Sequence, residues 1–300
     1  MFRQHQVDRQ ARLVRDVGFF GPDSELWRVL RERSVVMGGM RALLMHAAHP
    51  LIAAAAAQTG MYEHDTWGRH ERTLRLTFTL VFGTRQEATT AARQINAAHR
   101  SVHGVDRCTG LAYSARDPEL LLWVHASLIS SFLLFERLTV GRLGDGGRQQ
   151  FHEEAITMAT LLGLPASRIP PAVGDLDAWI DARIDGGIFR LTASSHLVSS
   201  IMRDKANGTA GFKSHAAGFL ALHTLPSALR DLYGIDHNPS DQRKLKMLGA
   251  AIRAGRLLLP PNARFIGPAI AASARMRGEE ARVSETSVLP RRWRMESDAE

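Results

Sequence analysis

Apolar residues recur at helical spacing along most of the 300-residue chain, and this periodicity limits the fold more than any other feature. Within residues 84–103, for example, Ala88, Ala91 and Ile95 follow one another at steps of three and four, which is typical of one face of a helix. We find no run of alternating apolar and polar residues that would indicate a strand. The pattern therefore predicts an all-α protein.

Capping signals predict where the helices begin and end. Asp65 is a candidate N-cap for a helix over Thr66–Phe82, which Gly83 would end. Thr84 and Glu87 have capping-box spacing, so we expect a helix from there to His103. Asp117 followed by Pro118 predicts a further helix to about Leu138.

The glycine pair Gly38-Gly39 is expected to break the chain path before a helix over Met40–Gln58. Pro50 lies in the middle of that segment, where it removes a helical hydrogen-bond donor and is expected to bend the helix.

Composition indicates a globular chain with one large domain. Apolar residues make up 45% of the sequence, which suffices for a sizeable core at this length. Cys108 is the only cysteine, which excludes a disulfide scaffold, a cysteine-based zinc site and covalent c-type haem. We expect an N-terminal extension over residues 1–23, a single helical domain over 24–281 and a polar tail over 282–300.

The net charge of +8 is compatible with an anionic partner, but the arginines are scattered through helical segments and favour a solvated basic surface. No helix-turn-helix signature accompanies them, so we do not expect nucleic-acid binding. The first residues carry charge and lack the apolar region of a secretion signal. We expect a cytoplasmic protein, with peripheral membrane contact left open.

The longest apolar stretch, residues 34–59, has the length of a membrane span but contains Arg41, His46 and His49. A lipid-facing cation is costly, so a buried core helix that faces a polar site explains these residues better than a transmembrane helix. We therefore predict no membrane-spanning helix in the chain.

Three histidines lie within or beside apolar stripes. His99 lies on the stripe of the helix predicted to end at His103, and His125 lies on that of the helix after Pro118. A single histidine in such a stripe is more often a satisfied core residue than a ligand. His99 and His103, four residues apart, could together bind a metal, although neither a glutamate of the HExxH type nor an obvious third ligand accompanies them.

Arg69, Arg72 and Thr73 share one face of the helix over Thr66–Phe82. A buried guanidinium needs an anion, because an uncompensated buried charge costs roughly 3–5 kcal/mol. Glu63, Asp65 or Glu71 could supply that anion. Alternatively, the two arginines could bind the propionates of a haem whose iron is held by His99, in a largely apolar pocket.

Several stretches of the sequence, in their order and spacing, resemble the MpaB and latex-clearing-protein family of oxygenases. The resemblance covers about residues 28–184. It is carried by the following segments: Arg41-Ala42-Leu43-Leu44, His49-Pro50, Arg69–Thr73, Val81-Phe82-Gly83-Thr84, Ala98-His99 with Val102 and Gly104, Tyr113–Leu120, and Trp123-Val124-His125-Ala126.

This resemblance implies an all-α fold that encloses a non-covalent b-type haem and cleaves carbon–carbon double bonds of isoprenoid chains with dioxygen. By position, His99 matches the histidine that coordinates the haem iron, and Arg69 and Thr73 match a polar pair near the haem. Arg72 falls where latex-clearing proteins can place a lysine on the distal side of the iron. Because arginine stays protonated and is a poor ligand, we expect water or an empty position there.

A second difference concerns the glutamate proposed as a base in latex-clearing proteins, whose position falls in the alanine run Ala53–Ala57. We therefore expect a small hydrophobic, isoprenoid-like alkene as substrate rather than polyisoprene. Dioxygen, and an electron donor as a further candidate, would be the other partners. Thr73, His49 or His125 could hydrogen-bond the bound oxygen, and His103 is retained as a cofactor-binding candidate.

Two other classes of function remain open at this point. A haem-binding sensor or carrier would use the same residues without consuming dioxygen. A helical binding protein without a cofactor would keep Arg69, Arg72 and His99 as ordinary core polar groups. The absorption spectrum of the purified protein distinguishes the haem proteins from the cofactor-free one.

Overall fold

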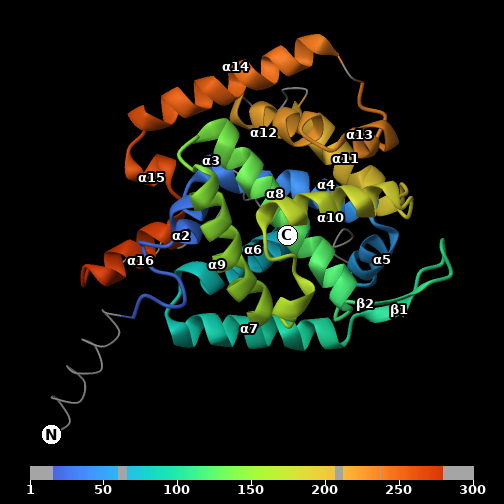
Figure 1. Ribbon diagram of the computed structural model, residues 1–300, viewed down its shortest axis with the longest axis horizontal. Coiled ribbons are helices and arrows are strands. Elements are labelled where there is room, and N and C mark those ends of the chain that lie inside the picture. The colour runs from blue at the N-terminus through green and yellow to red at the C-terminus, as the bar shows by residue number, and fades with distance from the viewer. Residues whose placement is uncertain (1–15, 60–65, 207–211, 237, 280–300) are drawn as a thin grey trace, which may run out of the picture.

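The computed structural model describes residues 16–59, 66–206, 212–236 and 238–279, with the side chains of residues 66–73, 204–206 and 212–214 outside the description. Helices dominate these residues, with one small sheet, so the predicted all-α class is confirmed (Figure 1). The elements are α2 (Glu25–Leu30), α3 (Arg33–Val36), α4 (Gly38–Ala48), α5 (Pro50–Gln58), α6 (Thr66–Phe82), α7 (Arg85–Arg100), β1 (His103–Val105), β2 (Ala112–Ser114), α8 (Pro118–Thr139), α9 (Asp145–Leu161), η1 (Ala166–Arg168), α10 (Val173–Asp185), α11 (Ala193–Ala206), α12 (Phe212–His223), α13 (Ser227–Leu232), α14 (Pro239–Gly255), η2 (Arg256–Leu258), α15 (Pro261–Arg264) and α16 (Gly267–Met276).

Helix α8 runs through the centre of the molecule and packs against α2, α3, α4, α9, α10 and α14 (Figure 1). The predicted cap is present: the Asp117 carboxylate accepts from the backbone N–H of Glu119 and Leu120, and Pro118 occupies the first turn. α8 is long and apolar enough to cross a membrane, but 61% of its most apolar window is buried inside the protein. A helix that is apolar on all sides is expected at the centre of a core.

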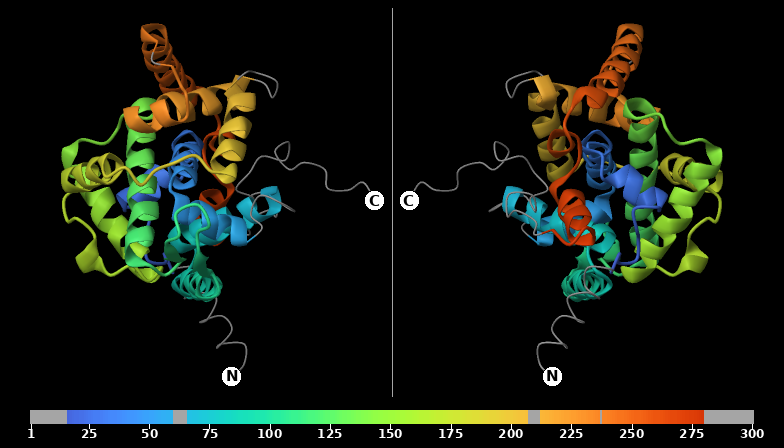
Figure 2. Two further views of the ribbon diagram at one scale, coloured as in Figure 1. Left: turned by 90° about the vertical axis from the view of Figure 1, so that its right-hand side faces the viewer. Right: turned by 90° about the vertical axis from the view of Figure 1, so that its left-hand side faces the viewer.

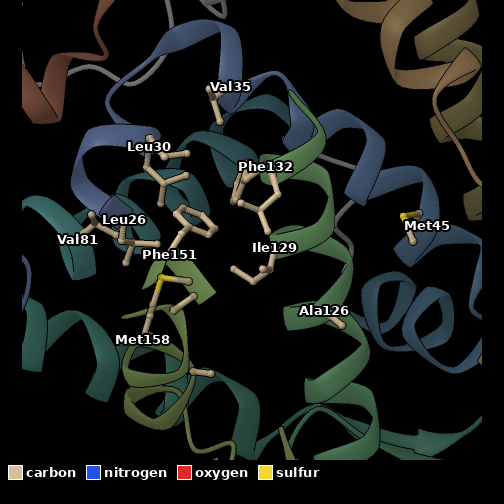
Figure 3. Close-up of a cluster of buried hydrophobic side chains, with 14 of the residues drawn as sticks. Leu26, Leu30, Val35, Met45, Val81, Ala126, Ile129, Phe132, Phe151 and Met158 are labelled. Carbon is tan, nitrogen blue, oxygen red and sulfur yellow. The ribbon is translucent and has the colours of Figure 1, made fainter. Parts of the chain in front are cut away.

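One part of the main hydrophobic core lies where α2, α8 and α9 meet. Figure 3 shows Ile129 and Phe132 of α8 pointing toward Leu30 of α2 and Phe151 of α9. These side chains are almost entirely buried, and burying an aromatic or branched side chain stabilises a fold by about 1.5–3 kcal/mol. The core therefore fixes the positions of the central helices.

The apolar stretch before residue 60 folds as two helices. α4 ends at Ala48 and α5 begins at Pro50, and the path from Arg33–Ala48 to Pro50–Gln58 bends by 99°. The bend predicted at Pro50 is confirmed, because the chain leaves helical geometry at His49 and proline opens the next helix. The expected single helix over Met40–Gln58 is wrong for the same reason.

Gly38 does not break a helix, contrary to the prediction. It begins α4, and the break lies at Met37, which ends α3. A Cβ at position 38 would lie 2.8 Å from the carbonyl oxygen of Ser131 on α8. Glycine is therefore required at this contact between α4 and α8.

Helices α6 and α7 form a hairpin that turns at Gly83 and Thr84. The helix over Thr66–Phe82 and the capping box are confirmed: the Glu87 N–H donates to the Thr84 hydroxyl at 3.2 Å, and the Thr84 N–H donates to the Glu87 carboxylate at 2.7 Å. The proposed cap at Asp65 lies outside the described residues.

The C-terminal boundary predicted for α7 is wrong. The helix ends at Arg100, and the chain turns through Ser101 and Val102 into a short antiparallel hairpin of β1 and β2, with His103 paired to Ser114. Gly104 lies on β1, and a Cβ at this position would lie 2.8 Å from the Tyr113 hydroxyl, so the Tyr113 side chain would have to shift to admit one. Such three-residue strands are too short to give an alternating pattern.

Candidate functional site

The open end of the α6–α7 hairpin carries the predicted iron ligand. His99 is the penultimate residue of α7 and is partly exposed. Among the described residues, no hydrogen bond or ion pair engages its ring. Partial burial lowers its pKa, so the imidazole is neutral at pH 7 and keeps one nitrogen lone pair.

Arg69, Arg72 and Thr73 lie in the N-terminal half of α6, and their side chains are outside the described part of the structure. The hairpin turn at residues 83 and 84 reverses the chain, so this half of α6 lies at the same end of the hairpin as His99. The backbone is thus compatible with a site shared by the two helices. Which groups the three side chains contact stays a prediction.

His103 does not join His99 on one helix face, so the proposed pair four residues apart on a helix is not formed. His103 begins β1 and is exposed. The reason is local: α7 ends at Arg100, and the pairing of β1 with β2 begins at His103. Among the described residues, no group of three or more His, Cys, Asp or Glu side chains is arranged to hold a metal ion.

His49 occupies the bend between α4 and α5 and is only 4% exposed. Its ring packs edge-on against Phe189, with centroids 5.5 Å apart, and lies 6.2 Å from the Trp123 ring. Nδ1 has no partner among the described residues. Burial lowers the pKa of His49 to about 4, so the ring is neutral at pH 7. It is buried among aromatic side chains.

His125 lies inside α8, as its apolar stripe predicted, and is 6% exposed. Its ring centroid lies 6.5 Å from that of His152 on α9. His152 Nε2 contacts the carbonyl oxygen of Pro170 at 2.7 Å, while His125 Nε2 and His152 Nδ1 lack partners among the described residues. Burial, and secondarily the neighbouring His152, lower the pKa of His125 to about 3. The His125 ring is therefore neutral at pH 7.

A buried polar chain joins α4 to α8. The Arg41 guanidinium donates to the Ser131 hydroxyl at 2.8 Å and, through Nε, to the carbonyl oxygen of Thr224 at 2.9 Å. One turn earlier on α8, the Ser127 hydroxyl donates to the Trp123 carbonyl oxygen, and His46 Nε2 lies 2.7 Å from the same hydroxyl oxygen.

Arg41 is a buried cation without a carboxylate at ion-pair distance among the described residues. It is 5% exposed, and burial lowers its pKa to about 10, so it remains charged at pH 7. The apolar stretch over residues 34–59 predicts that Arg41 faces a polar site, but it does not indicate which groups Arg41 contacts. Ser127 and Ser131, four residues apart on an otherwise apolar helix, were the available signal.

Comparison with known proteins places these residues in a family context. The family model for the catalytic domain of ER-bound oxygenase mpaB/B′ and rubber oxygenase matches residues 27–254. The chain is 26% identical over 187 residues to uncharacterized protein Mb2261 of Mycobacterium bovis and to uncharacterized protein Rv2237 of Mycobacterium tuberculosis. Each alignment covers 60% of this chain and 71% of the relative. No solved structure matches significantly. The family match covers both helices of the hairpin and the whole of α8, and the chain accordingly belongs to the mpaB and rubber-oxygenase catalytic-domain family of oxygenases.

Proposed function

We propose that this protein is a haem b-dependent oxygenase that uses dioxygen to cleave the double bond of a small hydrophobic, isoprenoid-like alkene. The observation that carries the proposal is His99: a neutral, partly exposed imidazole without a protein partner among the described residues. Membership of an oxygenase family supports the reaction class.

The described residues fit a haem better than a metal bound by protein ligands alone. A single neutral imidazole suffices to hold haem iron, because the porphyrin supplies the other ligands. A protein-bound zinc or non-haem iron needs three or more side chains, and no such group occurs among the described residues.

A haem bound here would supply dioxygen binding and activation, and the chain's own residues would control access to it. His99 would hold the iron, with α7 orienting the ring. Arg69 and Arg72 would bind the propionates, and Thr73 would donate a hydrogen bond to a polar group beside the iron. The apolar side chains around the hairpin would exclude water and receive the alkene.

The histidines within the core are weaker candidates for contact with dioxygen. His49 faces Phe189 and Trp123, and His125 faces His152. No ring contact between either of them and His99 occurs among the described residues. We therefore propose that Thr73, rather than His49 or His125, would supply the hydrogen bond to dioxygen at the cofactor.

The substrate class rests on α5. This helix reads Pro50-Leu51-Ile52 followed by the alanine run Ala53–Ala57, so it offers no carboxylate as a base. A short alkene whose cleavage needs no carboxylate base from α5 fits this composition better than a polymer whose cleavage needs one. We propose an electron donor only to bring the haem to its ferrous state.

The decisive experiment compares two histidine variants during haem titration. The wild-type protein should give a Soret band that shifts with dithionite and with carbon monoxide. His99→Ala should lose or shift that band, whereas His103→Ala, which alters an exposed strand residue four positions away, should leave it unchanged. An unchanged Soret band in His99→Ala would show that another residue holds the iron.

Turnover separates the oxygenase from a haem-binding sensor. The reconstituted protein should consume dioxygen with short isoprenoid alkenes and release two carbonyl products. A protein that binds haem and carbon monoxide but consumes no dioxygen with any alkene would be a sensor or carrier. A protein that takes up no haem would contradict both assignments.

A further inference from the structure

The C-terminal part of α14 and the segment after it form an exposed apolar surface at the edge of the molecule. Four of the eight exposed large apolar side chains of the described residues lie between positions 247 and 259. Leu258 is 87% exposed, Met247 73% and Leu257 66%, and Leu259 continues the row. α14 lies along one edge of the fold and projects from the body (Figures 1 and 2).

Helix α14 has two apolar faces, and only one of them packs against the protein. Leu245 and Gly249 are buried toward α8 and α12. On the opposite side, Met247, Ala250 and Ala254 recur at steps of three and four, and all three are exposed. Leu257 and Leu258, in η2 directly after α14, are exposed as well. A surface helix that packs on one side only normally has polar residues on the side that faces solvent.

The exposed leucines are held in place by ion pairs on both sides of them. Glu32, only 3% exposed, binds Arg256 at 3.2 Å just before the leucines and also binds Arg264 just after them. The backbone N–H of Ile266 donates to the carbonyl oxygen of Arg31 and fixes the chain again. The segment Leu257–Leu259 is therefore attached to the rest of the protein by contacts on both sides of it.

The same part of the chain carries only positive charge. Residues 242–278 contain eight arginines and lysines and no aspartate or glutamate. Arg243 and Lys246 are exposed beside the outer stripe, and Lys244 pairs with Asp241 at 3.0 Å. An apolar strip with basic residues beside it is the pattern by which amphipathic helices bind anionic membrane surfaces.

We propose that the outer face of α14 together with Leu257–Leu259 binds the surface of an anionic lipid bilayer, with the leucines among the acyl chains and Arg243 and Lys246 at the headgroups. A symmetric contact between two copies would bring these cations together, which disfavours dimerisation through this face. Neither α14 nor Leu257–Leu259 belongs to the α6–α7 hairpin, so lipid binding by this surface does not depend on a haem or on oxygenase activity.

The test is co-sedimentation of the full chain with phosphatidylcholine vesicles prepared with and without phosphatidylglycerol. Binding should require phosphatidylglycerol and weaken at about 1 M salt, because screening removes the electrostatic attraction. The double variant Leu257→Asp/Leu258→Asp should bind at least ~10-fold more weakly, since apolar insertion and surface charge both become unfavourable. Both positions are exposed, so the fold should tolerate the change.

A matched control uses the other exposed apolar pair, Val105 and Leu111, on the β1–β2 hairpin away from α14 (Figure 1). Val105→Asp/Leu111→Asp should bind vesicles like the wild type. Equal loss in both double variants, or no binding to phosphatidylglycerol vesicles at all, would overturn the proposal. So would a wild-type dimer in analytical ultracentrifugation that Leu257→Asp/Leu258→Asp converts to monomer, because this face would then join two copies.

Discussion

The α4–α8 interface and the open end of the α6–α7 hairpin both place histidines among apolar residues, but the protein treats them differently. At this interface His49 is 4% exposed and lies against Phe189, and on the α9 side of α8 His125 is 6% exposed and lies against His152. At the hairpin end burial also lowers the pKa of His99, yet its side chain is still partly exposed. A ligand must reach the residue that binds it, so desolvation combined with access, rather than burial alone, distinguishes a candidate ligand from a core histidine.

The largest expected difference between the two regions is in stability. Trp123 on α8 is 1% exposed, donates from Nε1 to the carbonyl oxygen of Met45 and packs against His49 and Phe189. Trp123→Ala should lower the free energy of unfolding by about 3–5 kcal/mol, because it leaves a large cavity. Urea denaturation measures this, and a loss below ~1 kcal/mol would mean that the interface is not the stabilising centre.

The buried polar chain should respond less strongly but specifically. Ser131→Ala removes the hydroxyl that accepts from Arg41 and leaves a buried guanidinium N–H unpaired, which should cost about 1–3 kcal/mol. Ser101→Ala, which removes an exposed hydroxyl after α7, is the matched control and should change the unfolding free energy by less than ~0.5 kcal/mol. Similar losses in the two variants would argue against a role for the Arg41 contact.

The histidines whose pKa is lowered by burial should make the free energy of unfolding depend on pH. The folded pKa of His125 is about 3 and those of His46 and His49 are about 4, against an ordinary value of 6.5. As the pH falls below 6.5, these histidines therefore take up protons in the unfolded chain but not in the folded one. The free energy of unfolding then falls toward pH 4 by about 1.4 kcal/mol per pH unit for each ring.

His125→Leu should reduce this slope by one histidine's share. Chemical denaturation at several pH values between 6.5 and 4 measures the slope in the variant and in the wild type. Identical slopes would indicate that the His125 ring takes up a proton in the folded state as easily as in the unfolded chain.

The smallest expected effect on stability belongs to the residue with the largest proposed effect on haem. His99 is partly exposed and has no partner among the described residues, so His99→Ala without haem should change the unfolding free energy by less than about 0.5 kcal/mol. A thermal or urea melt of the apoprotein measures it. A loss of several kcal/mol would identify His99 as a structural residue and weaken its assignment as a ligand.

Some features of the fold could be read directly from local residue patterns. The capping box at Thr84 and Glu87, the cap at Asp117 and the bend at Pro50 were all predicted and are present. Each depends on residues within one helical turn, whose hydrogen bonds and φ angles the neighbouring residues set. The end of α7 was missed, because strand pairing between β1 and β2 competes with helix continuation only once the chain has folded.

The sequence by itself therefore determined the fold class, several helix boundaries and the family, since helical periodicity, caps and motif spacing are local properties. The tertiary structure alone decided which polar groups meet: Arg41 with Ser131, His125 with His152, and Glu32 with two arginines more than two hundred residues away. It also decided that His99 stays accessible while His49 does not, and that α14 leaves an apolar face uncovered. Periodicity tells which residues share a helix face, whereas packing between helices determines which face is covered.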